Sequence, residues 1–190
     1  MKKQFVFAIV LSCSLLLAAG CGKKASDNTT SDNSSTTTSE NVNKFTTEEG
    51  NFKIAFPGEP TISNEKVPTE VGDIDMHMYM YEKGYDEAYM VAFSDYPKEL
   101  VDAGDKGEML QGSKEGVVSN ISAKLEDEKK IEIDGHPGLF FKAKGPQFAT
   151  VYKLFMVNNR LYQVGILRAS DYPSDADTKS FLDSFELIRK

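Results

Sequence analysis

The chain has 190 residues, of which 40% are hydrophobic, 27% charged and 11% aromatic. This composition is ordinary for a globular protein and excludes collagen-like, coiled-coil and wholly disordered classes. The formal net charge of −7 argues against a nucleic-acid partner, because such binders neutralise phosphates with clustered Lys and Arg. The length predicts one domain with an appendage.

The first 20 residues are a predicted signal peptide. Lys2 and Lys3 precede an apolar run of 13 residues at 5–17, which is shorter than the about 20 that a spanning helix needs. Small residues then lead to Cys21. This order resembles the lipobox of bacterial lipoproteins, although Leu17 lies one position further from the cysteine than is usual. The alternative is an ordinary secretory signal that leaves Cys21 as a free thiol.

Lipidation at Cys21 implies an anchor in the cell membrane, with the protein on the extracytoplasmic face. Lipoproteins carry a diacylglyceryl thioether at this cysteine, and two or more acyl chains such as palmitate anchor stably where one does not. Cys13 lies in the signal and leaves with it. The mature domain is then expected to contain no thiol, which excludes disulfides, a cysteine nucleophile and Cys-based metal sites.

Residues 21–44 are predicted to be a disordered tether that begins at the lipidated Cys21. Of residues 22–44, 14 are Ser, Thr or Asn and none is aromatic, so burial cannot offset their conformational entropy. The remaining residues, 45–190, are expected to form one domain. They include 17 basic and 26 acidic residues. A domain of this size can bury a sufficient hydrophobic core without disulfides or structural metal ions.

The domain is predicted to be rich in β-strands. Asp134-Gly135 and Asn158-Asn159 are typical of two-residue hairpin turns. Strands at 88–93 and 151–157 are apolar on both faces and therefore need cover on both sides. Two patterns predict strands, namely the alternation of apolar and polar residues and short apolar runs. The predicted strands are 52–56, 73–83, 88–94, 131–133, 139–143, 150–157 and 161–167.

Two helices are expected beside these strands. Asp105 and Glu108 have the spacing of a capping box that begins a helix through about residue 122. Within it, Gly112 and Gly116 are expected to allow close approach to a sheet. A second helix is expected to begin near Ser174. The simplest arrangement is an α+β domain in which an antiparallel sheet is sandwiched between helices.

Five segments of this domain match a known sequence pattern: FKIAFPGEP at 52–60, DYP at 95–97, GHPG at 135–138, RLYQV at 160–164 and FLDSF at 181–185. Together they resemble a group of uncharacterised bacterial lipoprotein domains that are similar to the PsbP family of photosystem II extrinsic proteins. The resemblance spans nearly all of 45–190 and implies an α–β–α fold. Proteins with this fold act by docking to partners, and the resemblance implies no catalytic set.

The sequence indicates no catalytic site, and we expect no enzyme activity, cofactor or bound metal. The Gly-x-Ser-x-Gly elbow and the phosphate loop are both missing from the sequence. The candidate bases are His77 and His136, and the latter is expected in a turn with a structural or solvated role. Asp171, Asp175 and Asp177 lack the spacing of a calcium loop, and are more simply explained by a helix start.

Methionines alternate along 76–80, which reads Met-His-Met-Tyr-Met. Thioethers are soft ligands that suit Cu(I), so copper binding is an alternative to core packing here. In a strand, however, Met76, Met78 and Met80 share one face while His77 points to the other, so the two residue types cannot chelate one ion. Methionine also fills irregular core gaps, and core packing is the expectation.

Tyr79 and Tyr81 are the predicted binding residues. Tyrosine offers apolar area with a polar end and is enriched at interfaces, although strand propensity also explains it. We therefore expect a non-enzymatic, lipid-anchored module that docks an unidentified envelope protein. The alternative is a lipoprotein that binds a small ligand, or less favourably copper, in a pocket between sheet and helix lined by methionines or tyrosines. Hydrolysis is the function that the residues support least.

Overall fold

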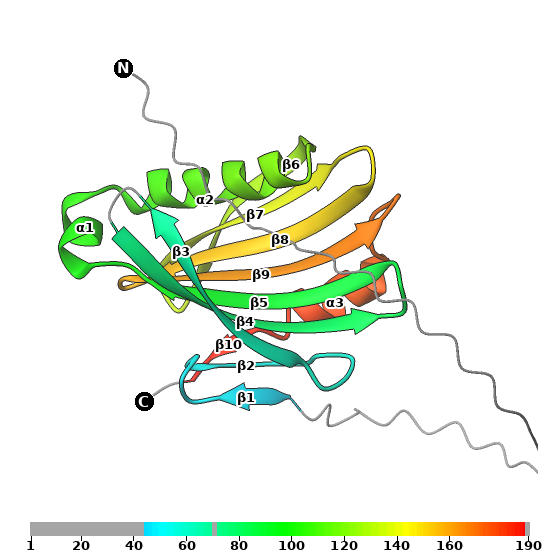
Figure 1. The fold of residues 1–190 in the computed structure, drawn as a ribbon, viewed down its shortest axis with the longest axis horizontal. Helices are drawn as coiled ribbons and strands as arrows, with labels where there is room; N and C mark the ends of the chain where they lie inside the picture. Colours follow the sequence, from blue (N-terminus) through cyan, green and yellow to red (C-terminus); the bar gives the residue numbers. More distant parts are fainter. Residues whose placement is uncertain (1–43, 70–71, 189–190) are drawn as a thin grey trace, which may run out of the picture. The chain divides into compact units, whose positions relative to one another are not determined.

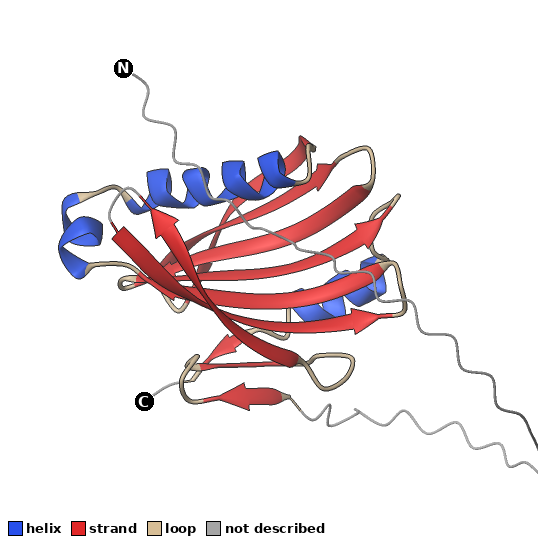
Figure 2. Ribbon diagram, in the orientation of Figure 1, coloured by secondary structure: helices blue, strands red, loops and turns tan. Residues whose placement is uncertain are grey.

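The computed structural model describes residues 44–69 and 72–188, which form a mostly antiparallel β domain (Figures 1 and 2). Cys21, the predicted signal and nearly all of the predicted tether lie outside the described residues. Within the described ranges, no helix is both long and apolar enough to span a bilayer. The elements in chain order are β1 (Phe45–Thr47), β2 (Phe52–Ile54), β3 (Thr61–Thr69), β4 (Gly72–Lys83), β5 (Glu87–Asp95), α1 (Lys98–Ala103), α2 (Lys106–Asn120), β6 (Lys124–Ile133), β7 (His136–Lys144), β8 (Phe148–Val157), β9 (Arg160–Ala169), α3 (Asp175–Leu182) and β10 (Glu186–Leu187).

Seven strands form the main sheet in the order β3-β4-β5-β9-β8-β7-β6, and every neighbouring pair is antiparallel. Both predicted hairpin turns are confirmed. Asp134 and Gly135 join β6 to β7 with φ of 47° and 80°, and Asn158 joins β8 to β9 with φ of 54°. Positive φ is the backbone conformation that Asn, Asp and Gly tolerate best, which explains these residues at the two turns.

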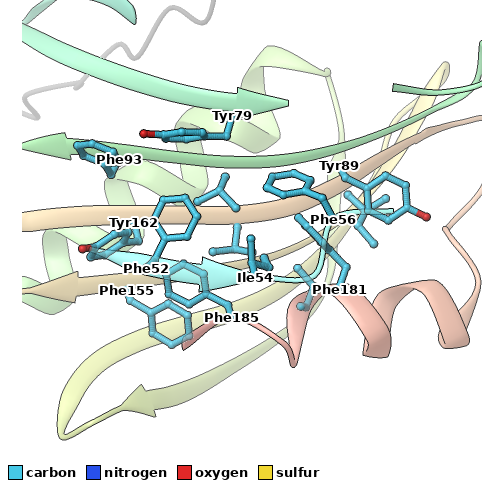
Figure 3. Packing of buried hydrophobic residues seen from close by; sticks show 14 of the residues in the cluster. Phe52, Ile54, Phe56, Tyr79, Tyr89, Phe93, Phe155, Tyr162, Phe181 and Phe185 are labelled. Carbon is cyan, nitrogen blue, oxygen red and sulfur yellow. The ribbon is translucent and has the colours of Figure 1, made fainter. Parts of the chain in front are cut away.

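A second, smaller sheet packs with α3 on one face of the main sheet. It contains β1, β2 and β10 in the order β1-β2-β10, so the two ends of the domain meet in it (Figure 1). Phe52 and Ile54 of β2 are fully buried. They pack with Phe181 and Phe185 near α3 and with aromatic residues of the main sheet, as Figure 3 shows. This aromatic cluster is the larger part of the core.

The opposite face of the main sheet is covered in part by α1 and α2. Val101 of α1 and Leu110 and Val117 of α2 pack with Phe141 and Leu154 of the sheet in a second buried cluster. Helix α2 lies on β7 and β8. Strand 151–157, which was predicted to be apolar on both faces, is therefore covered on both sides. Strand 88–93 packs one face into the aromatic cluster, but its other face is covered only in part, because Met90 is half-buried.

Gly112 does not bring α2 close to the sheet. A Cβ built at this position has no heavy atom within 4 Å. The expectation of a close approach at Gly112 is therefore wrong, whereas Gly116 is buried and its role in a close approach stays a prediction.

The helix starts are confirmed by their capping contacts. The Asp105 side chain accepts a hydrogen bond from the Glu108 N–H at 2.9 Å at the start of α2. The Ser174 hydroxyl accepts one from the Asp177 N–H at 3.0 Å at the start of α3. Each bond satisfies a backbone donor that the first helical turn leaves without a partner.

The expected antiparallel sheet is confirmed, but the expected sandwich between two helices describes the domain only in part. Helix α3 shares its face with the small sheet, which the sequence did not predict. Strand β3 and helix α1 were not predicted either. The small sheet covers Tyr79 of β4, which is one of the two predicted binding residues.

Candidate functional site

Tyr79, the first predicted binding residue, is buried. Its side chain is 2% exposed, and its ring lies 5.3 Å from Phe52 and 6.3 Å from Phe93 (Figure 3). Its hydroxyl lies 3.3 Å from the Thr47 hydroxyl of β1. The expectation that Tyr79 faces a partner is therefore wrong, because the small sheet covers this face of β4.

Tyr81, the second predicted binding residue, is half-buried. Its ring lies against Gly58, where a Cβ would come within 2.4 Å of it, and 6.2 Å from Tyr89. A role for Tyr81 in binding stays a prediction. His77 shares this face, as expected, and stacks on Phe93 with ring centroids 4.5 Å apart.

A groove of about 630 Å³ lies between the small sheet and the tip of the β6–β7 hairpin. Its lining combines the buried Phe185 and three half-buried apolar side chains with charged ones, and it comes from segments that are far apart in the sequence. The lining residues are Thr46, Lys53, Ile133, Asp134, Phe185, Glu186, Leu187 and Ile188.

Strand alternation builds one wall of this groove. Phe52 and Ile54 of β2 point into the core, so Lys53 between them points outward. The strand register places Thr46 of β1 and Glu186 of β10 on either side of Lys53. The hairpin turn at Asp134 and Gly135 carries the other wall.

Glu186 is the electrostatic centre of the groove. Its carboxylate pairs with Lys44 and, at 2.8 Å, with Lys53. The hydrogen bond from Lys44, followed by the one from Lys53, lowers the pKa of Glu186 from 4.5 to about 2. On this wall two ammonium groups pair with one carboxylate, and Asp134 adds a second carboxylate on the other wall.

The groove has the chemistry of a binding surface. Ile133, Leu187 and Ile188 are half-buried and offer apolar contact area, and the paired charges beside them offer polar contacts to a partner. Protein interfaces combine an apolar centre with a polar rim in this way. Among the described residues, the groove lining has a hydroxyl at Thr46 but no histidine and no cysteine.

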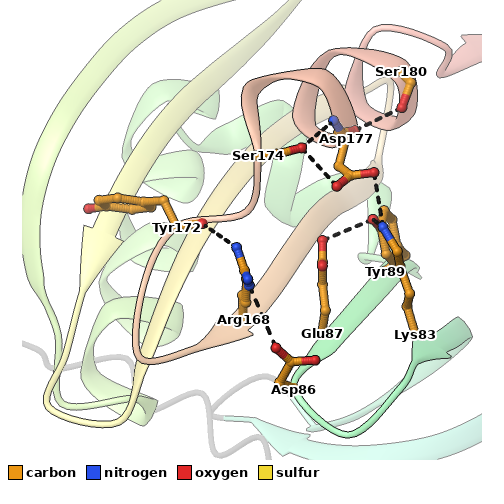
Figure 4. A network of polar contacts seen from close by, with 9 residues as sticks. All are labelled: Lys83, Asp86, Glu87, Tyr89, Arg168, Tyr172, Ser174, Asp177 and Ser180. Carbon is orange, nitrogen blue, oxygen red and sulfur yellow. Dashed lines mark hydrogen bonds and ion pairs between the residues drawn. The ribbon is translucent and has the colours of Figure 1, made fainter.

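The acidic residues near α3 have structural roles. Asp177 accepts hydrogen bonds from Lys83 at 3.1 Å and from the Ser174 hydroxyl at 2.8 Å, which ties the β4–β5 hairpin to α3 (Figure 4). Asp171 pairs with Lys144 at 2.9 Å. Across residues 44–69 and 72–188, no three His, Cys, Asp or Glu side chains are grouped to hold a metal ion.

The same network includes the buried ring of Tyr89. Its hydroxyl donates to Glu87 at 2.9 Å and accepts from Lys83 at 3.3 Å (Figure 4). Burial, and then the Glu87 hydrogen bond, raise the pKa of Tyr89 above its usual value. This hydroxyl therefore stays protonated and acts as a fixed donor.

A second cavity, of about 500 Å³, lies between α2 and the β6–β7 hairpin. Its position between a helix and the sheet is the one expected for a small-ligand pocket. Its lining differs from the expectation, because it contains neither methionine nor tyrosine. It is lined by Gly107, Leu110, Gln111, Lys130, Ile131, Glu132, Pro137, Gly138 and Leu139.

The sequence matches no protein-family model and no curated protein. Among solved structures, the chain is similar to the solution structure of cyanobacterial PsbP (CyanoP) from Synechocystis sp. PCC 6803. The two are 14% identical with a TM-score of 0.52, over 76% of this chain and 91% of that chain. At this identity the likeness shows the fold alone. The domain has a PsbP-like fold, as the sequence resemblance implied.

Proposed function

We propose that this chain is a lipid-anchored, extracytoplasmic module of the cell envelope that docks a partner protein and catalyses no reaction. The observation that carries the proposal is the groove beside the small sheet, with its apolar lining and the Lys44–Glu186–Lys53 charge cluster. An extended segment with apolar side chains, and polar side chains that can pair with Lys53 or Glu186, fits this chemistry.

The groove lies where the chain enters the domain. Lys44 is the first described residue, and it pairs with Glu186 in the groove wall. The segment that we expect to be the tether, ending in a lipid at Cys21, therefore joins the domain beside the groove.

The PsbP-like fold supports docking through the sequence resemblance, because proteins of that fold act by binding partners. We also propose that the α–β–α layering of that fold applies here. In this domain α2 forms one outer layer, and α3 together with the small sheet forms the other. The small sheet then enlarges the layer that carries the groove.

The proposal is tested by capture of partners with formaldehyde in intact cells, followed by mass spectrometry of the crosslinked species. Leu187→Asp places a charge in the groove, and Ile62→Asp is its matched control, because Ile62 is 57% exposed on the edge strand β3. We expect the groove variant to lose the captured species and the control to keep them. Loss in neither variant contradicts docking at the groove.

Two further variants keep this test interpretable. Lys53→Glu reverses a half-exposed charge and should weaken capture even where Leu187→Asp lowers the melting temperature. Cys21→Ser should abolish lipid labelling and membrane pelleting. Unchanged labelling of Cys21→Ser contradicts the anchor while leaving the groove prediction standing.

A second candidate function, the binding of a small ligand, is favoured by the cavity between α2 and the β6–β7 hairpin. Its volume of about 500 Å³ lies in the range of ligand pockets. Protein isolated from its host should then carry a small molecule in native mass spectrometry and lose it on denaturation. A mass equal to that of the bare lipoprotein under both conditions contradicts this function.

A further inference from the structure

Four of the seven methionines of the chain gather on one face of two adjacent strands. Met76, Met78 and Met80 alternate along β4, and Met90 of β5 lies directly opposite Met80 in the strand register. Residues that pair directly share a face, with Cβ atoms about 4.5–5.5 Å apart. Alternate residues of one strand lie about 6.5–7 Å apart. The Cβ atoms of Met78, Met80 and Met90 therefore form a compact triangle on this face of the sheet.

This methionine face is set apart from the main core. Met76 and Met78 are buried with Val67 and Ala92 in a small cluster of their own. Met90 is only partly buried, packed between this cluster and the cluster beneath α2. Met78 therefore lies at the border between this buried cluster and the two half-buried methionines, Met80 and Met90.

The methionine face borders exposed residues of the edge strand β3. Met80 and Met90 are half-buried. Thr61 and Ser63 of the edge strand β3 pair with Met80 and Met78, and both are exposed. Helix α2 packs on β7 and β8, which β9 separates from β5, so the helix layer sits over a different part of the sheet.

We propose that Met78, Met80 and Met90 form a thioether site for Cu(I). Thioether sulfur is a soft ligand that selects Cu(I) over the hard cations. Methionine side chains are unbranched with three rotatable bonds, so three of them can converge on one ion without moving the strands. Three neutral ligands leave the ion with a single positive charge, which a half-buried site tolerates better than a double one.

His77 takes no part in this site. It stacks on Phe93, on the opposite face of β4 from the methionines. The third ligand comes instead from the neighbouring strand, which is why the spacing within β4 alone did not reveal the site. The site lies on the other face of the main sheet from the docking groove, so the two proposals are independent.

The site is tested by anaerobic titration of Cu(I) in competition with a chromophoric Cu(I) chelator. The full chain carries Cys13→Ser and Cys21→Ser, so that no thiol competes for the ion. We expect one equivalent of Cu(I) to bind, and the added pair Met80→Leu and Met90→Leu to weaken binding at least tenfold. Met and Leu have similar volumes, so the fold should tolerate this pair, and the melting temperature checks it.

Two matched controls and a spectrum separate the site from nonspecific binding. Met109→Leu on α2 and His77→Gln on the opposite face should leave the Cu(I) affinity unchanged. The X-ray absorption spectrum of the bound ion should show a shell of sulfur alone. Unweakened binding by the Met80→Leu, Met90→Leu protein, absence of a bound equivalent, or a nitrogen ligand in the shell each overturns the proposal.

Discussion

Gly165→Ala is expected to destabilise the domain although it adds a single methyl group. Gly165 lies in β9, between Met90 of β5 and Tyr152 of β8. The Tyr152 ring lies over it, so that a Cβ at this position would be 2.3 Å from the Tyr152 Cε2 atom and 2.5 Å from Cδ2. Tyr152 is itself buried and stacks on Phe141 with centroids 5.5 Å apart. The ring therefore has no free space to move into.

The size of the effect follows from this overpacking. Adding carbon atoms to a filled core costs about 1–3 kcal/mol. A domain of this size loses about 4 °C in melting temperature for each kcal/mol, so Gly165→Ala should melt about 4–12 °C lower. Calorimetry or circular dichroism of the purified protein measures the shift.

Gly112→Ala is the matched control, because the same change is made where there is space. Gly112 lies within α2, and a Cβ there meets nothing within 4 Å. Alanine forms helix better than glycine, so this variant should gain about 0.5–1 kcal/mol. The reasoning is refuted if Gly165→Ala has the same melting temperature as the wild type, or if both variants are destabilised equally.

Three further changes test the core and the groove. Phe56→Ala removes a buried ring that lies 5.1 Å from Phe181, and should cost about 3–5 kcal/mol in urea unfolding; a loss below about 1 kcal/mol contradicts the packing. Tyr162→Phe removes the 2.8 Å hydrogen bond to the Gly50 carbonyl and should cost about 1 kcal/mol, and an unchanged urea midpoint argues against that bond. Glu186 has a folded pKa of about 2 against an ordinary 4.5, so its contribution to stability is present above pH 4.5 and is lost as pH falls toward 2. Between these pH values the urea midpoint of wild type should approach that of Glu186→Gln, and a constant gap between them refutes the lysine pairing.

Local rules were sufficient for most of the main sheet. Period-two alternation and the Asp134-Gly135 turn predicted its hairpins, and the side chains of Asp105 and Ser174 predicted the helix starts. Each of these signals depends on residues that are only a few positions apart in the sequence. Their physical causes, positive φ and unpaired N–H groups, act at that range.

The small sheet depends on contacts that no local signal carries. Strands β1 and β10 have three and two residues, too few for a period to show, and Lys44 and Glu186 are 142 positions apart in the sequence. Burial of Tyr79 follows from this sheet, because β1 and β2 lie over it. The groove was missed for the same reason, since its wall exists only once both ends of the domain have met.

Strand β3 escaped prediction because its sequence is polar on both sides. Residues 61–66 are exposed, and Val67 alone carries a buried side chain among the residues of β3 whose side chains are described. Its hydrogen bonds to β4 hold it in place. Exposed polar edges protect sheets against pairing with other chains, so this strand has the composition of a loop for a physical reason.

The claim that this domain docks a partner through the groove is tested most directly by photo-crosslinking in living cells. A benzophenone side chain is placed at position 187 in the groove or at position 115, where Glu115 is exposed on α2. The account predicts a discrete protein adduct from position 187 that disappears with Lys53→Glu, and none from position 115. Adducts of the same mass and yield from both positions, or no adduct from position 187, would contradict it.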